Sequence, residues 1–269
     1  MIEPLLAAAV LLAPANADAA FDPSFAAYGR LLRHVVHDAR VDHLALKADR
    51  APLDAIVASF DDPATHGEAS WPRDERLAFW INAYNVFTLR TIVDHYPIRG
   101  SWFSFAPKNS IRQIDGAWTT LTWRAAGRAV SLDQIEHEIL RPLFKEPRVH
   151  FAINCASKSC PPLAAEPYVA ARLEAQLDEA GRRYLGSSYG LQVSGDNLKV
   201  TSILKWYGND FIERFASTVA SEQPEAVRAV LGAVVRFGPP TAAALAKTVR
   251  ARVTFLPYDW SLNDVDRAR

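Results

Sequence analysis

The sequence predicts an α+β fold: a single domain in which helices pack on a small, mostly antiparallel sheet. Helical and strand patterns are mixed along the 269 residues, without the regular strand–helix alternation of a parallel sheet. The chain shows no internal repeat, no Gly/Ser-rich linker and no long run of charge, so we expect residues 20–269 to form one domain. A hydrophobic content of 49% with 22% charged residues is typical of a globular protein.

The charge balance argues against two classes of partner. Thirty Lys and Arg residues match thirty Asp and Glu residues, so the surface lacks the excess of positive charge that nucleic acids and anionic membranes attract. After the N-terminal segment, no apolar run approaches eighteen residues. We therefore expect no nucleic-acid partner and no membrane-spanning helix.

The N-terminal segment predicts export. Residues 5–15 form an apolar run that is too short to span a bilayer, and two A-x-A patterns, ending at Ala17 and Ala19, follow it. This arrangement is typical of a signal peptide, here residues 1–19, and predicts a periplasmic or secreted protein. Residues 1–4 lack the positive charge that usually begins such a signal, so an ordinary first helix is the alternative.

The first helices are expected at 24–40 and 50–60, where apolar residues recur at helical spacing. Residues 74–95 predict the longest helix, which is apolar nearly all round, ends before a proline, and should lie buried at the centre of the domain. Asn82 and Asn85 share one face of it. Because a buried amide needs partners, we expect these two residues either to line a binding site or to anchor a loop.

The rest of the chain predicts short strands and amphipathic helices. Ser131 and Gln134 form a capping box that begins a helix. The elements are expected, in order, as short strands around 117–124, that helix from 132 to about 141, a buried strand over 148–154, a helix over 168–184 with Gly186 as its C-cap, a hairpin of 191–193 and 198–200, helices near 203–216, 223–236 and 240–250, and a last strand over 253–258.

The helix that begins at 132 separates a glutamate from a histidine. On a helical wheel Glu136 falls on the apolar face and His137 on the polar face. A carboxylate on an apolar face needs a partner, and His150 from the next predicted strand is suited to that role. Cys155 follows closely, so the three residues suggest a nucleophile (Cys155), a base (His150) and an orienting carboxylate (Glu136).

Cys155 lies where the predicted strand over 148–154 gives way to a short polar stretch. If a helical turn begins there, its free N–H groups, with Lys158 nearby, lower the pKa of the thiol and favour a thiolate nucleophile. His150 and Cys155 are five residues apart, which places them on opposite faces of a regular strand. The catalytic interpretation therefore requires the strand to end or bulge before Cys155.

Further residues are candidates for binding the substrate. Asn154 and a backbone N–H after Cys155 are candidate donors to an oxyanion. Trp206 begins the predicted helix after the hairpin, where its ring belongs either to the core or to the wall of a groove. The expected substrate-binding set is Asn154, Asn82, Asn85, Ser157 and Trp206.

No cofactor is expected. His34 and His37 lie one helical turn apart with His43 beyond them, but no clear further ligand completes a metal set. The chain also lacks the glycine-rich patterns that bind nucleotides and the G-x-S-x-G pattern of serine hydrolases. We therefore expect neither a metal nor a nucleotide cofactor.

The two cysteines of the chain, Cys155 and Cys160, allow other interpretations. In an exported protein, two cysteines at this spacing often form a local disulfide. A buried free cysteine is also common as a small apolar side chain. A redox-active pair is a further alternative, although the familiar redox motif has the shorter Cys-x-x-Cys spacing.

Four motifs resemble those of the domain of unknown function 547 family. They are LAFWINAYNVFTLRTIV at 77–93, SLDQIEHEILR at 131–141, PRVHFAINCASKSCPPL at 147–163 and SILKWYGNDF at 202–211. The resemblance implies a distant similarity to papain-like and transglutaminase-like cysteine enzymes. It also implies that Glu136, His150 and Cys155 are the family's catalytic set, and it suggests a thiol peptide such as glutathione as a ligand.

Two hypotheses for the function follow. The first is an exported cysteine-dependent hydrolase or acyl transferase that acts on an amide, thioester or peptide bond. The alternative is a non-catalytic module that binds a small peptide or a thiol compound such as glutathione and contains a Cys155–Cys160 disulfide. The sequence favours no particular oligomeric state.

Overall fold

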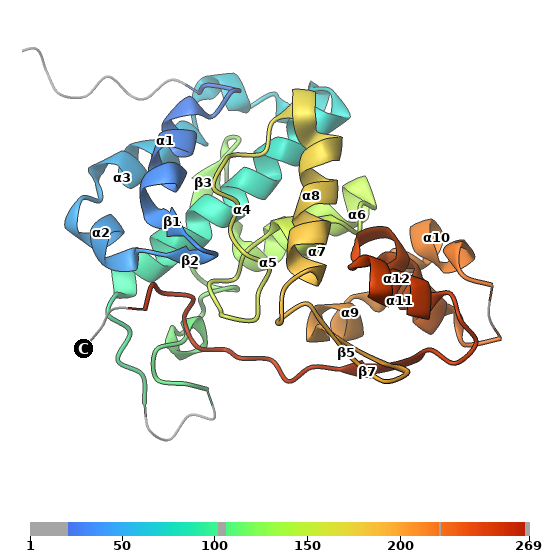
Figure 1. The fold of residues 1–269 in the computed structure, drawn as a ribbon. Coiled ribbons are helices and arrows are strands. Elements are labelled where there is room, and N and C mark those ends of the chain that lie inside the picture. Colours follow the sequence, from blue (N-terminus) through green and yellow to red (C-terminus); the bar gives the residue numbers. More distant parts are fainter. Residues whose placement is uncertain (1–20, 102–105, 221, 267–269) are drawn as a thin grey trace, which may run out of the picture.

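The helix α4 (Arg73–His95) is buried on all sides from Leu77 to Leu89, as its all-round apolar pattern predicts. It forms the middle of the larger of two main hydrophobic clusters in the computed structural model, which describes residues 21–101, 106–220 and 222–266. Helices α1 to α3 pack on one side of α4, and the helical segment 132–144 packs on another (Figure 1).

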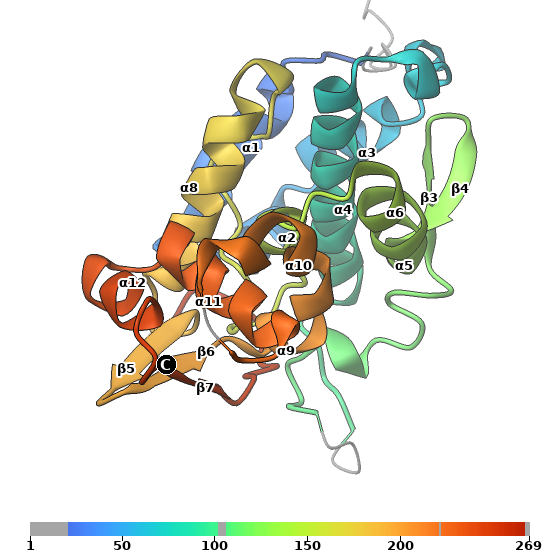
Figure 2. The same ribbon diagram turned by 90° about the vertical axis from the view of Figure 1, so that its right-hand side faces the viewer.

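The second hydrophobic cluster joins the C-terminal helices to a three-stranded sheet (Figure 2). In this sheet β5 pairs with β6 in antiparallel register, and β7 is added parallel to β6. Two separate antiparallel pairs, β1–β2 and β3–β4, lie elsewhere on the molecule. The expected fold class is confirmed: the chain forms one α+β domain with small, mostly antiparallel sheets.

The bounds of the elements agree with the sequence pattern for most of the chain. The helices are α1 (Ala26–Val35), α2 (His43–Ala48), α3 (Ala51–Ser59), α4, α5 (Leu132–Gln134), α6 (Arg141–Phe144), α7 (Val149–Ala152), α8 (Leu173–Leu185), α9 (Ser202–Trp206), α10 (Ile212–Phe215), α11 (Glu225–Phe237) and α12 (Pro240–Ala246). The strands are β1 (Val36–His37), β2 (Arg40–Val41), β3 (Thr122–Ala125), β4 (Arg128–Ser131), β5 (Leu191–Ser194), β6 (Asn197–Val200) and β7 (Arg252–Phe255).

The segment 148–154 is helical, so the prediction of a buried strand there is wrong. Its backbone N–H groups bond to nearby carbonyls, Phe151 to Arg148 and Ile153 to Val149, and form the short helix α7. Every residue of α7 is buried because the helix lies between the two hydrophobic clusters. An apolar pattern of this length cannot distinguish a buried turn of helix from a buried strand.

The helix predicted from 132 to about 141 begins at the expected capping box of Ser131 and Gln134 but continues to Phe144. It passes Pro142 by widening into a π-helical turn over Ile135–Leu140, where the N–H of Arg141 bonds five residues back. Such a turn relieves the clash that a proline ring makes with the preceding turn of a regular helix. Glu136 lies in this π turn.

Two further predicted helices are shorter than expected. The helix over 24–40 ends at Val35, because the chain reverses through Asp38 and Ala39, both in the left-handed region, into the β1–β2 hairpin. The helix near 203–216 is divided into α9 and α10 by a turn at Gly208–Phe211. Gly186 caps α8, as the sequence predicts.

Residues 256–265, the C-terminal strap, cross the molecule beside the loop that follows α7 (Figure 1). The N–H of Lys158 donates to the carbonyl of Ser261, and the N–H of Asn263 donates to the carbonyl of Ala156. The strap then pairs with Val41 of β2. The C-terminal strap therefore holds the cysteine-containing loop in place.

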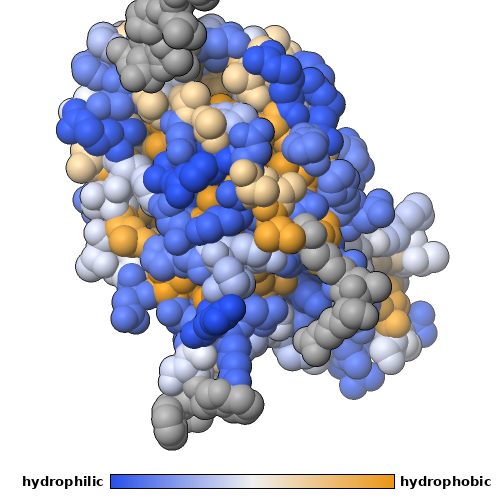
Figure 3. Space-filling model, turned by 90° about the vertical axis from the view of Figure 1, so that its left-hand side faces the viewer, coloured by the Kyte–Doolittle hydropathy of each residue, from blue (hydrophilic) through white to orange (hydrophobic). Residues whose placement is uncertain are grey.

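The predicted signal peptide, residues 1–19, lies outside the described residues. Within the described ranges, no helix combines the length and the apolar character that a membrane span requires. The face over the N-terminal helices carries mainly hydrophilic side chains with small apolar patches between them (Figure 3).

Candidate active site

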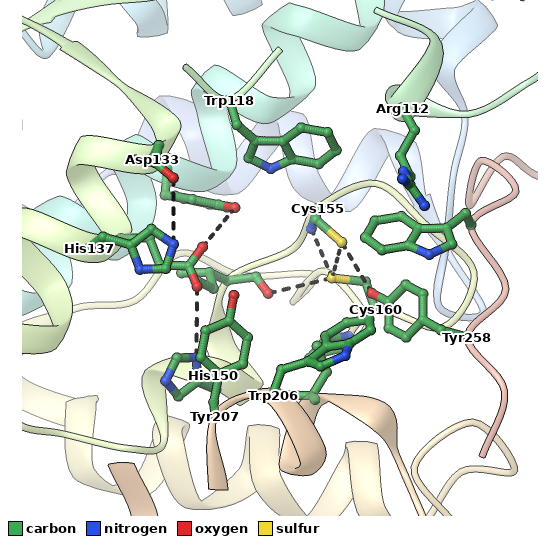
Figure 4. A pocket seen from close by; sticks show the side chains of 16 residues that line it. Arg112, Trp118, Asp133, His137, His150, Cys155, Cys160, Trp206, Tyr207 and Tyr258 are labelled. Atoms are coloured by element: carbon green, nitrogen blue, oxygen red, sulfur yellow. Dashed lines mark hydrogen bonds and ion pairs between the residues drawn. The ribbon is translucent and has the colours of Figure 1, made fainter. Parts of the chain in front are cut away.

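A cavity of about 310 Å³ opens where the two halves of the molecule meet. Its walls come from α4, the helical segment 132–144, α7 with the loop after it, α9, and the C-terminal strap. Cys155, His150 and Glu136 all line this one cavity, and Figure 4 shows Cys155 and His150 in its wall. Trp206 also lines it, with 47% of its surface exposed.

Cys155 is a partly exposed residue, and its sulfur has three side-chain partners. The sulfur of Cys160 lies 2.7 Å away, the hydroxyl of Tyr258 3.2 Å away and the hydroxyl of Ser157 3.3 Å away. The hydrogen bond with Cys160 contributes most to lowering the pKa of the Cys155 thiol, and those with Ser157 and Tyr258 contribute less. Burial raises the pKa, but the net result is a pKa of about 7. A thiol with this pKa is half ionised near neutral pH.

Cys160 has the opposite character. It is buried, and burial together with the neighbouring Cys155 thiolate raises its pKa well above the ordinary value. Both cysteines are free in the structure. Cys155 is thus the ionisable member of the pair, and Cys160 is the proton-holding member beside it.

The loop at Cys155 has a constrained backbone. Ala156 has a φ of 59°, a left-handed conformation that residues other than glycine seldom adopt. Its N–H donates to the side-chain oxygen of Asn154 at 2.9 Å, and its carbonyl accepts from the N–H of Asn263 at 3.0 Å. The loop is therefore clamped from its own chain and from the C-terminal strap.

The asparagines of α4 anchor two neighbouring segments, Asn85 the loop at Cys155 and Asn82 the segment at Tyr168. Asn85 donates to the carbonyl of Ala152 and accepts from the N–H of Asn154, which fixes the end of α7. Asn82 bonds in the same way to both backbone groups of Tyr168. Of the two roles left open for Asn82 and Asn85, the contacts match the anchoring of loops rather than the lining of a site.

Asn154 is also engaged by the protein itself. Its side-chain N–H donates to the carbonyl of Pro161 at 2.7 Å, and its oxygen accepts from Ala156. Of the donors expected to hold an oxyanion, the side-chain N–H of Asn154 and the backbone N–H of Ala156 are thus used within the loop. The N–H of Cys155 itself points to the sulfur of Cys160 at 2.9 Å. Ser157, by contrast, is placed next to the Cys155 sulfur through its hydroxyl and its backbone N–H.

Glu136 and His150 meet as the helical wheel indicates. Glu136 is buried and faces inward, whereas His137 is exposed. A carboxylate oxygen of Glu136 lies 4.0 Å from Nδ1 of His150, and the other accepts from the hydroxyl of Tyr84 at 3.3 Å. The ring of Tyr207 stacks on the imidazole with 4.1 Å between the centroids and fixes its plane.

Asp210 is a member of this group that sequence reasoning missed. Its carboxylate lies 2.8 Å from Nε2 of His150 and accepts two hydrogen bonds from Arg141, at 2.7 and 2.9 Å. Burial raises the pKa of Asp210, but the hydrogen bonds from His150 and Arg141 outweigh it and hold the pKa well below the usual range. No local spacing links Asp210 to His150, because sixty residues separate them and only the fold brings α7 against the turn after α9.

His150 and Cys155 belong to different walls of the cavity (Figure 4). Within the described part of the chain, the hydrogen-bonding partners of the Cys155 sulfur are Cys160, Ser157 and Tyr258, and His150 is not among them. Because α7 is a helix, the objection based on opposite faces of a strand no longer applies. The two nitrogens of His150 face the carboxylates of Glu136 and Asp210 instead.

Three aromatic rings extend from the cysteines toward the mouth of the cavity. Tyr258, which touches the Cys155 sulfur, packs against Trp260 with 4.5 Å between ring centroids and against Trp206 with 4.8 Å. Trp206 and Trp260 are themselves stacked at 6.0 Å. Tyr258 and Trp260 lie on the C-terminal strap, about a hundred residues from Cys155, so no local sequence pattern indicates that they belong to the site.

The three histidines of the N-terminal region differ in their exposure to solvent. His34 and His37 are exposed, while His43 is buried with Nε2 3.1 Å from the side-chain oxygen of Asn263. Across residues 21–101, 106–220 and 222–266, no three His, Cys, Asp or Glu side chains are grouped to hold a metal ion.

Residues 69–185 match the model of a family described as "Protein of unknown function, DUF547". No curated protein and no solved structure matches the chain. The matched segment contains Glu136, His150 and both cysteines. It ends before α9, the turn after α9 that contains Asp210, and the C-terminal strap that supplies Tyr258 and Trp260.

Proposed function

We propose a function from the site itself, because residues 69–185 match the model of the DUF547 family and the description of that family names no activity. The protein is a cysteine-dependent hydrolase or acyl transferase that acts on an amide, thioester or peptide bond. The observation that carries this proposal is the partly exposed Cys155, whose thiol has a pKa of about 7, in the wall of a cavity large enough for a small acyl compound.

In the proposed reaction the Cys155 thiolate attacks the substrate carbonyl, and the carbonyl π electrons move onto its oxygen. Collapse of this intermediate breaks the bond to the amine or thiol, which leaves with a proton, and a thioester with Cys155 remains. Water or a second acceptor then attacks the thioester and releases the acyl group. Hydrolysis and transfer differ only in that acceptor.

The hydroxyl of Tyr258 and the backbone N–H of Ser157 take the role of oxyanion donors. Both already bond to the Cys155 sulfur, so both lie beside the atom to which the substrate carbonyl would become attached. Burial and the nearby thiolate raise the pKa of Tyr258 well above its ordinary value, which keeps its proton in place as a donor.

The acid–base group is the Glu136–His150 pair on the other wall. The Glu136 carboxyl lines the cavity and faces Nδ1 of His150, so a proton from this pair reaches the leaving group across the bound substrate. Asp210 holds Nε2 of His150 at 2.8 Å and so fixes the orientation of the imidazole. His150 thus serves protonation of the leaving group, while thiolate formation depends on Cys160, Ser157 and Tyr258.

Export to the periplasm or to the outside of the cell is part of the proposal. It is supported by the apolar run at 5–15 and the A-x-A patterns after it. Detection of a mature N-terminus near residue 20 in exported protein would support it, and an intact N-terminus in the cytoplasm would contradict it.

The test is turnover of a panel of acyl amides, thioesters and short peptides. We expect Cys155→Ala to reduce turnover to background while the thermal unfolding curve stays in place, because a small partly exposed thiol contributes little to packing. Glu138→Gln, on the exposed face of the same helical segment as Glu136, is the control that should keep full turnover. Unchanged turnover in Cys155→Ala would refute the mechanism.

A second candidate function rests on the 2.7 Å between the two sulfurs. This separation favours a disulfide under oxidising conditions, as in a non-catalytic module that binds a peptide or a thiol such as glutathione. Mass spectrometry of the peptide containing both cysteines, prepared from exported protein without reductant, distinguishes the two functions. A mass two hydrogens below the dithiol favours the binding module, and the full dithiol mass favours the enzyme.

A further inference from the structure

We infer that the ligand of the cavity carries a carboxylate, bound by Arg112, next to an aromatic group that lies on the rings of the C-terminal strap. This inference rests on the proposed function for the identity of the reacting bond. The binding of the carboxylate by Arg112 does not depend on turnover and is tested separately. The substrate class is an N-acylated aromatic amino acid or a short peptide that ends in one.

Arg112 is positioned as an anion-binding residue. It lines the cavity, and its guanidinium lies 5.0 Å from the centre of the Trp260 ring. Figure 4 shows this guanidinium turned toward the cavity on the side of Cys155. Among the described residues, no carboxylate lies within ion-pair distance of it, in contrast to Arg141, which Asp210 neutralises in the same region.

The backbone at Arg112 is held in place, which limits the positions that its guanidinium can occupy. The residue lies in a short turn, Ile111–Gln113, in which its N–H donates to the hydroxyl of Ser110 at 3.2 Å. Ile111 beside it is fully buried. A guanidinium that stacks on an indole keeps its N–H edge free, and this planar edge matches the two oxygens of a carboxylate.

The aromatic side chains connect this cation to the nucleophile. Trp260 lies between Arg112 and Tyr258, and the hydroxyl of Tyr258 reaches the Cys155 sulfur at 3.2 Å. A ligand that places its carboxylate at Arg112 and its reacting carbonyl at Cys155 therefore passes along these rings. An aromatic side chain gains stacking contacts there that a glycine cannot make.

The opposite wall gives the ligand a single orientation. Glu136 and Asp133 line that wall, so it carries negative charge where Arg112 carries positive charge. A carboxylate is repelled from the Glu136 side and attracted to the Arg112 side. The cavity therefore has a positive side and a negative side. An uncharged thioester or a peptide with a basic end would gain no ion pair with Arg112.

The experiment measures binding to Cys155→Ala protein, in which no turnover can occur, by quenching of tryptophan fluorescence. The ligands are N-acetylphenylalanine and its carboxamide, which differ only in the charged group. We expect the acid to bind at least about tenfold more tightly than the amide. We expect Arg112→Gln to remove this difference, and Arg250→Gln, which changes the same charge at an exposed position outside the cavity, to retain it.

Equal affinity for the acid and the amide would overturn the inference, as would a preference for the acid that survives in Arg112→Gln. Absence of binding by either compound would also overturn it. These binding results do not test the reaction of Cys155, which is tested by turnover in the parent protein. Conversely, acid-selective binding by a protein without turnover would retain Arg112 as the recognition residue and refute the enzyme.

Discussion

The short helix α7 separates two buried clusters of charged side chains that have opposite designs. Arg148, just before the helix, uses its five N–H groups on Glu146, Glu174 and Asp178, with distances of 2.7 to 2.8 Å to the carboxylates. His150, within the helix, faces the carboxylates of Glu136 and Asp210, and Glu136 in turn faces the cavity that holds Cys155. In the Arg148 cluster every N–H group of the guanidinium has a partner, whereas the His150 cluster borders the cavity that contains Cys155.

The comparison shows that buried charge alone does not mark an active site. Both Arg148 and His150 are nearly inaccessible and both have acidic partners. What distinguishes the His150 cluster is a path to the cavity and a partly exposed thiol at its far wall. Substitutions in each cluster test whether the Arg148 cluster serves stability and the His150 cluster serves chemistry.

The largest effect is expected for Arg148→Ala. Removal of this guanidinium leaves Glu146 buried without its main partner, which should lower the free energy of unfolding by about 3 to 5 kcal/mol. Arg236→Ala removes an exposed partner of Asp178 in the same cluster and should cost less than about 1 kcal/mol. Chemical denaturation measures both. Similar losses in the two variants would show that the Arg148 cluster is not a structural centre.

A smaller effect, on turnover rather than stability, is expected for Glu136→Gln. The amide keeps the shape of the side chain but cannot exchange a proton with His150, so turnover should fall about a hundredfold. His150→Ala should behave similarly. Steady-state kinetics beside Glu138→Gln provide the comparison, and a Glu136→Gln enzyme as active as that control would remove the pair from the mechanism.

Asn85→Ala should lower the free energy of unfolding by less than Arg148→Ala does. The lost contacts lie at the start of the loop that contains Cys155. The change leaves the carbonyl of Ala152 and the N–H of Asn154 without partners, at a cost of about 1 to 3 kcal/mol. Asn209→Ala, at an exposed position, should change stability by less than about 0.5 kcal/mol. If Asn85→Ala proved equally neutral, the anchoring role of Asn85 would be refuted.

The sequence predicts the features of the site that depend on one element. The capping box at Ser131, the inward direction of Glu136 and the buried helix with Asn82 and Asn85 all follow from helical spacing. These predictions are confirmed because the pattern of a single helix decides them.

The features that the sequence misses depend on segments distant in the chain. Asp210 and Tyr258 reach the site only through the packing of α9 and the C-terminal strap, and no local pattern records that packing. The strand predicted over 148–154 is wrong for a related reason. Its residues are buried by neighbours on every side, so their apolar character reflects tertiary structure rather than strand geometry.

The most direct test of the proposed chemistry is the pH dependence of Cys155 alkylation by iodoacetamide, read by mass spectrometry. Because its pKa is lowered, the thiolate is present above about pH 7, and we expect half-maximal labelling there rather than near 9. The half-point should stay in place in His150→Ala and move upward in Cys160→Ala, since Cys160 contributes most to the lowering. Labelling that begins only near pH 9, or only after a reductant is added, would contradict an activated Cys155.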